Sequence, residues 1–372
     1  MSIDFIPVNT PLLGGNEKKY INECIDTGWI SSEGPFIERF ESELSAKVNR
    51  KHGIAVSSGT AALDIAVSIL DLQKDDEVIM PSFTIISCAQ ALINKGVKPV
   101  LLDNDLRTFN MNVEDIENKI TNKTKAIMIV HIFGVTVDID PVLVLAKKHN
   151  LKIIEDAAQM IGQSYKGKQC GSFGNVSIFS FYPNKQITTG EGGMVLCDDE
   201  ALDKRAKSFR NLCFGVNRFI HEELGYNYRM TNMQAALGVA QLEKIDKIVQ
   251  KKRLIGNTYN ELLKDIEVIN LPVAKTDYCE NIYWVYAIVL KDNYTKTVKE
   301  VMKTLGRYKI GTRPFFYPMH KQPVFNKMGL FLDDILPNSE KIYEKGFYIP
   351  SGVALTKRQM EEVSEILHKV LV

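Results

Sequence analysis

The chain has 372 residues, 45% of them hydrophobic, so it can bury a large core and is longer than most single domains. Lys and Arg (46) nearly balance Asp and Glu (45), and the net charge of +1 gives no overall field that would attract nucleic acid or a membrane. The six cysteines form no close pair and the six histidines are isolated, which argues against a metal site or a disulfide framework. With no signal segment in residues 1–11 and no apolar run of membrane-spanning length, we expect a soluble, cytoplasmic protein.

The first two thirds of the chain alternate short apolar runs, typical of strands, with segments of helical periodicity. Helices are expected at residues 84–95 and 137–150. The expected strands include residues 53–58, 76–81, 98–103, 125–133 and 151–156. This alternation predicts an α/β fold, in which helices cover both faces of a mostly parallel sheet.

Residues 232 to about 263 keep apolar side chains at three- and four-residue spacing. This spacing predicts one long helix that crosses from a large domain into a smaller one. Gly238 and Gly256 weaken the helix, because glycine is a poor helix former.

The last third of the chain predicts a smaller α+β domain. It contains an apolar run at residues 281–290 and an amphipathic pattern at residues 357–371, which predicts a final helix. We therefore expect residues 1–245 to form the large, cofactor-binding domain with its N-terminal segment, and residues 246–372 to form the small C-terminal domain.

Two groups of side chains have an ordinary structural explanation. His131 ends an apolar strand, where a hydrogen-bonded core or rim histidine is at least as common as a catalytic one. Tyr283, Trp284 and Tyr286 are expected in the core of the small domain rather than at a ligand, because of their strand context.

Lys185 lies in a turn between a strand-like stretch at residues 177–181 and the glycine-rich residues 189–193. A lysine fixed on such a turn is a candidate to form a Schiff base with the aldehyde of pyridoxal phosphate, which requires a nucleophilic amine held near the cofactor. A solvated surface lysine is the alternative. The neighbouring motifs decide between the two.

Residues 57–61, Ser-Ser-Gly-Thr-Ala, precede an apolar pattern at helical spacing. A helix that begins there presents free backbone N–H groups and the positive end of its dipole, which suit a phosphate. Gly59 allows a close approach of the backbone, and Ser58 and Thr60 add hydroxyl donors. An ordinary serine N-cap is the alternative.

Asp156 ends the strand-like residues 151–156. In parallel α/β sheets, ligands lie beyond the carboxyl ends of the strands, so an acid at this place faces the site. Its carboxylate could pair with the protonated pyridine nitrogen of the cofactor and keep the ring an electron acceptor. The alternative is that Asp156 caps the following helix.

The order of these motifs resembles that of the sugar-nucleotide aminotransferases that depend on pyridoxal phosphate, the DegT/StrS-type family of fold type I enzymes. The resemblance rests on the phosphate turn, on Asp156 followed by Gln159, and on Lys185 followed by Thr-Thr-Gly-Glu-Gly-Gly, and it is strong in residues 179–195 and 225–238. It implies a large domain with a mostly parallel seven-stranded sheet flanked by helices, and a smaller C-terminal α+β domain.

The resemblance assigns to Lys185 the covalent link to the cofactor and the later proton transfers. Asn227 is expected to reach the phosphate bound by the other subunit of a homodimer, so that the active sites are shared. Ile85 stands where family members usually stack an aromatic ring on the cofactor, so the packing is expected to be aliphatic unless Phe83 moves in. The expected cofactor contacts come from Ser58, Gly59, Thr60, Ile85, Asp156, Gln159, Ser180, Lys185 and Asn227.

Within the family, this chain looks most like the GDP-perosamine synthases, which aminate carbon 4 of GDP-4-keto-6-deoxymannose. Four segments carry this likeness, residues 29–41, 103–110, 225–232 and 312–320. The resemblance implies ping-pong amino transfer from glutamate, with 2-oxoglutarate as the co-product and surface polysaccharide such as O-antigen as the destination of the sugar. The expected substrate contacts come from Ser31, Arg229, Arg313, Tyr317 and His320.

Two departures from the synthase pattern leave alternatives open. Gln159 stands where those synthases tend to carry an acid, and Tyr182-Pro183 stands where they carry Phe-Gly. Both features favour a UDP- or dTDP-linked keto sugar, and amination at carbon 3 is a further open alternative. A non-catalytic regulator or scaffold that kept the fold is a third alternative. Lysine rather than histidine at position 185 favours amination over dehydration.

Overall fold

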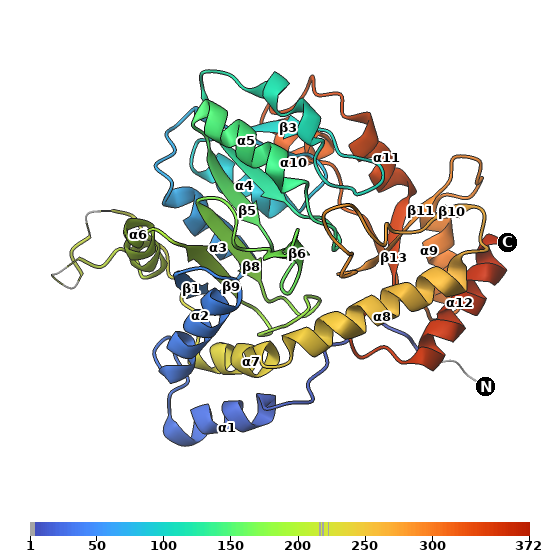
Figure 1. Ribbon diagram of the computed structural model, residues 1–372, viewed down its shortest axis with the longest axis horizontal. Helices are drawn as coiled ribbons and strands as arrows, with labels where there is room; N and C mark the ends of the chain where they lie inside the picture. Colours follow the sequence, from blue (N-terminus) through green and yellow to red (C-terminus); the bar gives the residue numbers. More distant parts are fainter. Residues whose placement is uncertain (1–3, 216, 218, 222) are drawn as a thin grey trace.

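The computed structural model describes residues 4–215, 217, 219–221 and 223–372 (Figure 1). A seven-stranded sheet with the strand order β1-β9-β8-β5-β4-β2-β3 forms the centre of its larger part. Strands β8, β5, β4, β2 and β3 are parallel, whereas β9 runs antiparallel to both β8 and β1. The expected α/β fold with a mostly parallel seven-stranded sheet is confirmed.

The observed elements agree closely with the strands and helices expected from the sequence. The strands of the large sheet are β1 (His52–Val56), β2 (Glu77–Pro81), β3 (Lys98–Leu102), β4 (Thr124–Val130), β5 (Lys152–Asp156), β8 (Val176–Ser180) and β9 (Gly193–Cys197). The helices around it are α1 (Glu17–Thr27), α2 (Pro35–Lys47), α3 (Gly59–Ser68), α4 (Ile86–Asn94), α5 (Ile139–His149), α6 (Glu200–Arg210) and α7 (Asn232–Leu242). Shorter elements are η1 (Val113–Asp115), η2 (Glu117–Lys119) and the hairpin of β6 (Ser164–Tyr165) and β7 (Lys168–Gln169).

Helices cover both faces of this sheet, because successive strand residues point to opposite sides. In β4, Met128 and Val130 belong to the same apolar cluster as residues of α3, α4 and α6. Their neighbours Ile127 and Ile129 belong to the cluster that contains α5. Toward β1 and β9, α2 and α7 cover this second face, and α1 packs on α7 (Figure 1).

The carboxyl ends of β1, β5 and β8 meet at one edge of the sheet, because these three strands run in the same direction. The chain leaves β1 directly into α3, whose N-cap is Ser58. Asp156 is the last residue of β5, and Ser180 is the last residue of β8. The motifs singled out from the sequence therefore lie at the same edge, where ligands of such sheets bind.

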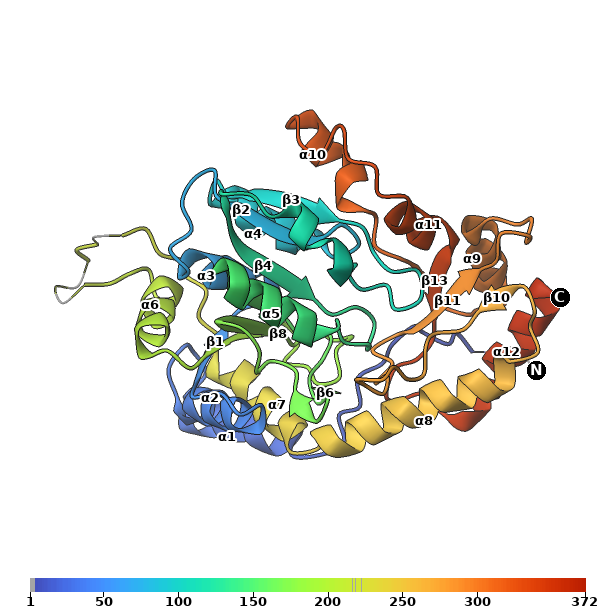
Figure 2. The ribbon, with the colours of Figure 1, turned by 45° about the horizontal axis from the view of Figure 1, so that its top comes forward.

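A second sheet with its own core lies at the other end of the molecule. Its order is β10 (Ile269–Asn270), β11 (Tyr286–Leu290), β13 (Gly346–Ile349), β12 (Arg313–Pro314), and all pairs are antiparallel. Helices α8 (Ile245–Leu263), α9 (Val298–Arg307) and α12 (Lys357–Leu371) contribute to its core, and α8 spans the distance from α7 to this sheet (Figure 2). The remaining elements are η3 (Met319–Lys321), α10 (Pro323–Lys327) and α11 (Pro337–Lys345).

The single long helix expected over residues 232–263 is wrong, because α7 ends at Leu242 and α8 begins at Ile245. At the break, the Glu243 carboxylate accepts hydrogen bonds from the Tyr20 hydroxyl (2.6 Å) and from Arg39 (3.0 Å). Lys244 forms an ion pair with Glu17. These tertiary contacts with α1 and α2 coincide with the break, and helical periodicity alone could not reveal them.

The N-terminal segment contacts the second sheet, although we grouped it with residues 1–245. The Ile6 N–H donates to the Lys309 carbonyl (2.9 Å), and the Ile6 carbonyl accepts from the Gly311 N–H (2.8 Å). The Ile6 side chain lies in the core of the second sheet. Ile6 thus lies against the part of the molecule that the last third of the chain forms. The domain boundary at residue 246 stays a prediction.

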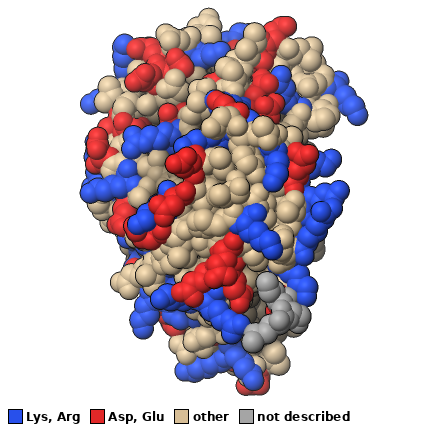
Figure 3. Space-filling model, turned by 90° about the vertical axis from the view of Figure 1, so that its right-hand side faces the viewer, with Lys and Arg blue, Asp and Glu red and all other residues tan. Residues whose placement is uncertain are grey.

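The surface at the second-sheet end mixes Lys and Arg with Asp and Glu, and no broad area of one sign appears on this face (Figure 3). This distribution agrees with the near-zero net charge of the chain. Within the described ranges, no helix combines the length and the apolar character needed to cross a bilayer.

Gly238 of α7 marks a close approach of two helices, and its replacement tests this packing. A Cβ at position 238 would lie 2.7 Å from the buried Phe40 ring of α2. We expect Gly238→Ala to lower the free energy of unfolding by about 1–3 kcal/mol through overpacking, despite the better helix propensity of alanine. Gly306→Ala in α9, where nothing lies within 4 Å of the added Cβ, should instead be neutral or stabilising by up to about 1 kcal/mol. Chemical denaturation of both variants checks this, and equal stabilisation by both would contradict it.

Candidate active site

One cavity of about 410 Å³ brings together most of the predicted cofactor contacts at the carboxyl edge of the large sheet. Its volume is in the range of small-molecule sites. Residues of the second sheet region close its other side, among them Trp284 and Tyr348. The predicted residues that line it are Ser58, Gly59, Thr60, Ile85, Asp156, Gln159, Ser180 and Lys185.

The first turn of α3 forms one end of the cavity. The Ser58 hydroxyl caps the helix by accepting from the Ala61 N–H (3.1 Å), so the predicted N-cap is present. The N–H groups of Gly59 and Thr60 have no acceptor among the described residues. The Thr60 and Ser87 hydroxyls lie 2.9 Å apart. These donors, at the positive end of the helix dipole, suit a phosphate group.

Gly59 is required by a close contact with β8. A Cβ at this position would lie 2.7 Å from Cβ of Ser180, so a larger residue would push the start of α3 away from the strand end. Because glycine stands here, the Ser180 side chain and the start of α3 line the same end of the cavity.

Asp156 lies in the cavity wall and is almost fully buried. One carboxylate oxygen accepts from the Ala158 N–H (2.9 Å), and the other accepts from the Cys88 thiol (3.3 Å). Burial raises the pKa of Asp156, while the Ala158 N–H and the Cys88 thiol oppose that rise. A carboxylate held in this way is suited to bind a protonated ring nitrogen.

Lys185 also lines the cavity, with its backbone held in a turn by a hydrogen bond to the Tyr182 carbonyl (2.9 Å). Its Nζ lies 4.0 Å from the centre of the Trp284 ring. Burial lowers the pKa of Lys185 to about 8, and the negative charge of Asp156 limits the change. A larger fraction of this amine is therefore unprotonated near neutral pH than of an ordinary lysine.

Gln159 and Ile85 complete the part of the cavity between these groups. The Gln159 side-chain oxygen accepts from the Phe133 N–H (2.7 Å), which leaves its amide NH₂ as the available donor. Ile85 is 43% exposed and lines the cavity, and its expected packing on the cofactor ring stays a prediction. Phe83 is fully buried against Phe133 and does not line the cavity.

These features fit pyridoxal phosphate, the cofactor expected from the sequence. The cavity combines donors for a phosphate at the start of α3, a carboxylate for the ring nitrogen at Asp156, and an amine of lowered pKa at Lys185. Each group has a matching chemical need in the cofactor.

Six of the predicted residues do not line this cavity in the single chain, and three of them, Asn227, Ser31 and Arg229, lie on the large-sheet part of the molecule. Asn227 is exposed, at the end of the segment that follows α6, and Ser31 is exposed before α2. Arg229 donates to the Asn211 side chain. Their expected roles, which for Asn227 involve a second subunit, stay predictions.

The other predicted substrate residues lie in β12 of the second sheet or in the segment directly after it. Arg313 pairs with Tyr348 in the β12–β13 ladder, and Tyr348 lines the cavity. Tyr317 is 38% exposed. His320 is buried, with one ring nitrogen 2.8 Å from the Ser82 hydroxyl and the other 3.1 Å from the Glu340 carboxylate. Both nitrogens therefore have partners within the chain, and His320 is not among the residues that line the cavity.

Trp284 is the most informative residue that the sequence-based prediction missed as a site residue. Tyr283 and Tyr286 lie in the core of the second sheet as expected, but Trp284 lines the cavity beside Lys185. The strand context was misleading, because β11 begins only at Tyr286 and Tyr283 adopts a left-handed backbone conformation (φ 47°). Side-chain alternation therefore could not be counted through residue 284.

His131 is a core residue. Its Nδ1 accepts from the Val137 N–H (3.0 Å), and its Nε2 lies 3.2 Å from the buried Glu155 carboxylate. Glu155 also accepts from the N–H groups of Gly171 (2.7 Å) and Phe173 (2.8 Å). The Cys170 thiol lies near this pair, and the hydrogen bonds involve both His131 ring nitrogens and both Glu155 oxygens.

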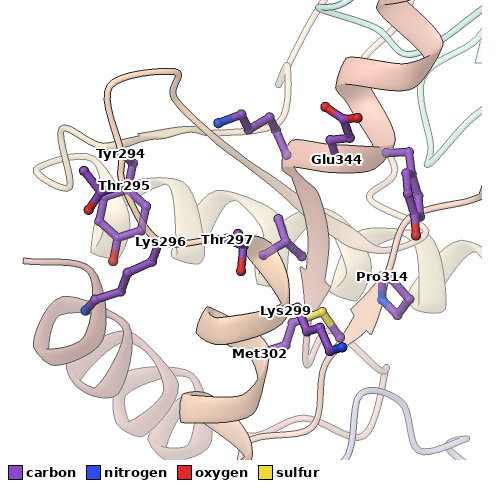
Figure 4. A pocket seen from close by; sticks show the side chains of 11 residues that line it. Tyr294, Thr295, Lys296, Thr297, Lys299, Met302, Pro314 and Glu344 are labelled. Carbon is purple, nitrogen blue, oxygen red and sulfur yellow. The ribbon is translucent and has the colours of Figure 1, made fainter.

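A larger hollow of about 620 Å³ lies on the second sheet region, against the start of α9 (Figure 4). Its charged side chains, among them Lys296, Lys299 and Glu344, come from the surface of the chain. It has no carboxylate and lysine buried together, so it lacks the chemical groups that distinguish the cavity at Lys185.

Similarity to known proteins agrees with this geometry. The chain matches the DegT/DnrJ/EryC1/StrS aminotransferase family over residues 11–368. It is 39% identical to the GDP-perosamine synthase of Escherichia coli O157:H7 over 98% of each chain. It is 40% identical to the GDP-perosamine synthase of Caulobacter vibrioides over 99% of this chain and 98% of that enzyme.

The fold is similar to that of Helicobacter pylori PseC, an aminotransferase involved in the biosynthesis of pseudoaminic acid, with a TM-score of 0.93, 25% identity and 99% coverage of both chains. These similarities confirm an enzyme rather than a scaffold, and pyridoxal phosphate as its cofactor. The chain belongs to the DegT/DnrJ/EryC1/StrS aminotransferase family.

Proposed function

We propose that this enzyme transfers the amino group of glutamate to carbon 4 of GDP-4-keto-6-deoxymannose and so forms GDP-perosamine. The observation that carries the proposal is the placement of Lys185, Asp156 and the start of α3 around one cavity. The choice of substrate is supported by the nearly full-length likeness to two GDP-perosamine synthases. A cytoplasmic location, where nucleotide sugars are at hand, is part of the proposal.

When bound, pyridoxal phosphate supplies an aldehyde that carries the amino group and a ring that accepts electrons. The first turn of α3 and the Ser180 hydroxyl would hold the phosphate. Asp156 would hold the proton on the ring nitrogen, and the amide NH₂ of Gln159 would donate to the phenolic oxygen. Ile85 would pack on the ring face.

Lys185 would have two tasks that both require an unprotonated amine. Its amine would form the covalent link to the cofactor, and once released it would remove the proton from Cα of glutamate. In the second half of the reaction its protonated form would deliver a proton to carbon 4 of the sugar. The lowered pKa of Lys185 supports the two tasks and this proton delivery, because the amine can lose and regain its proton near neutral pH.

We propose that the enzyme is a homodimer with shared active sites. Apolar side chains on the surface support this, since Trp29, Ile30 and Leu224 are 49%, 51% and 92% exposed in the single chain. Asn227 lies near the base of the segment that carries Leu224, and would contact the phosphate bound by the other subunit. Ser31 follows the exposed Trp29 and Ile30, and would approach the substrate of the other site.

Arg313 and Tyr317 would contact the phosphates or the sugar, because Arg313 pairs with the cavity residue Tyr348. Arg229 would be available to an anionic substrate. His320, which is buried and does not line the cavity, would act indirectly, through these residues.

The second candidate function is amination of a UDP- or dTDP-linked sugar, or amination at carbon 3. The UDP- or dTDP-linked sugar is favoured by Gln159 and Tyr182, which depart from the synthase pattern and both line the cavity.

The pKa of Lys185 predicts how fast the cofactor-free enzyme takes up pyridoxal phosphate. Only the unprotonated amine attacks the aldehyde, and its fraction rises roughly tenfold between pH 7 and pH 9 for a pKa of about 8, then levels off. The visible absorption of the lysine-linked cofactor measures this rate. A rate that keeps rising tenfold per pH unit beyond pH 9 would contradict the lowered pKa.

Lys185→Ala should not develop the absorption of the lysine-linked cofactor and should lose about 10³-fold or more in activity. Lys204→Ala, on the surface of α6, is the control and should keep both the absorption and the activity.

The substrate assignment predicts which sugar gains an amine. Purified enzyme is incubated with glutamate and, separately, the GDP-, UDP- and dTDP-linked 4-keto-6-deoxyhexoses, and each product is analysed by mass spectrometry. We expect conversion of the GDP sugar, with amination at carbon 4 established by NMR. Conversion of only the UDP or dTDP sugar would overturn the substrate and leave the chemistry intact.

Shared active sites predict recovery of activity in mixed dimers. Lys185→Ala removes the reactive amine, and Asn227→Glu places a negative charge against the phosphate of the partner's site. Each variant alone should be inactive. Equal mixing after dissociation should restore about a quarter of the wild-type activity, because half of the dimers then contain one site without a defect. Mixing Lys185→Ala with Lys185→Arg is the control and should restore nothing. The absence of recovery in proven mixed dimers would exclude a shared site.

A further inference from the structure

Lys252, in the middle of α8, is a buried charged group with no role in the function proposed above. It is 3% exposed, and none of the ion pairs among the described residues includes it. Burial lowers the pKa of Lys252 to about 7. A lysine is rarely buried without a charged partner, and an apolar residue of similar size would avoid the cost of desolvation.

The contacts of Lys252 explain why a donor stands at this place. Its ammonium group donates to the Trp284 carbonyl (3.0 Å) and to the Ser351 carbonyl (2.5 Å). Without Lys252, both carbonyl groups would lose a buried hydrogen bond. Ser351 in turn receives the N-terminal segment, since its N–H donates to the Val8 carbonyl (3.0 Å). Lys252 therefore fixes the backbone of residue 284 to the helix and to the loop after β13.

The segment before Trp284 also depends on α8 for its conformation. Tyr283 has a left-handed backbone (φ 47°), which is unfavourable for a bulky residue and persists only where surrounding contacts enforce it. Its ring packs against Gly256, one turn after Lys252, where a Cβ would lie 2.2 Å from the Tyr283 ring. The Tyr283 N–H donates to the Asn281 side chain (2.6 Å). Lys252 and Gly256 thus hold two consecutive residues on one face of α8.

The indole of Trp284 links the backbone position of this residue to the active site through two contacts. Its Nε1–H donates to the Asn184 carbonyl (2.8 Å), next to Lys185 in the chain. Its ring centre lies 4.0 Å from Lys185 Nζ, where an aromatic face stabilises an ammonium ion. A shift of the ring would therefore change both the backbone support and the protonation of Lys185.

We propose that Lys252 is a positioning residue, which sets the place of the Trp284 indole over the Lys185 amine through its hydrogen bond to the Trp284 carbonyl. The proposal rests on the proposed role of Lys185 as the cofactor-bearing lysine. The position of Trp284 can nevertheless be measured without the cofactor or any substrate.

The chain has only two tryptophans, so Trp29→Phe leaves Trp284 as the only fluorescent indole. In this background, Lys252→Met should move the emission of the cofactor-free protein to longer wavelength and raise its quenching by acrylamide. Lys247→Met, an exposed lysine of the same helix, is the matched control and should change neither. In the enzyme with its cofactor, Lys252→Met should lower the rate constant of the half-reaction with glutamate roughly 10- to 100-fold and shift the pH titration of the visible absorption. Lys252→Met and Trp284→Phe should be non-additive in that rate constant.

A purely structural role for Lys252 would lower the melting temperature but leave the Trp284 emission, its quenching and the cofactor titration as in the parent. That result would overturn the proposal. If Lys252→Met does not fold, Lys252→Gln carries the test with the same measurements, because its amide keeps a donor but is too short to reach both carbonyls. Failure of the parent to bind pyridoxal phosphate would overturn the proposed function, and the fluorescence comparison would still decide the position of Trp284.

Discussion

The function depends on an amine held away from water beside a buried carboxylate. Removing Lys185 from bulk solvent lowers its pKa, and the nearby charge of Asp156 prevents a larger change. Asp156 itself needs two donors, the Ala158 N–H and the Cys88 thiol, to remain in the cavity wall. If Lys185 faced open water, a much smaller fraction of its amine would be unprotonated at neutral pH, and a carboxylate in open water would interact only weakly with a ring nitrogen.

Several elements of the fold together bring Lys185 and Asp156 to the same cavity, and no single element would do so. Asp156 ends one strand, Ser180 ends its neighbour, and Lys185 follows in the turn beyond, so strand direction alone brings them to one edge. The second sheet closes the cavity with Trp284, and a buried lysine of α8 holds that residue in place. The second sheet region supplies none of the predicted cofactor contacts, but through Trp284 it lines the cavity in which Lys185 lies.

Much of this arrangement could be predicted from the sequence, because its signals are local. The alternation of strands and helices, the cap at Ser58 and the acid at the end of β5 each follow from residue order and strand polarity. What could not be predicted depends on tertiary contacts. Cys88 reaches Asp156, at the end of β5, from helix α4. The break at Glu243 coincides with contacts to α1 and α2, and Trp284 turns into the cavity after a left-handed residue. Periodicity carries no information on any of these.

The most direct test of the central claim is to locate the covalent link between the chain and its cofactor. The enzyme is mixed with pyridoxal phosphate, reduced with borohydride and digested, and the modified peptide is identified by mass spectrometry. We expect the cofactor-derived group to be attached to Lys185. Attachment to the buried Lys252, whose pKa is also lowered, or to a surface lysine would contradict this role of Lys185, as would the absence of any attachment.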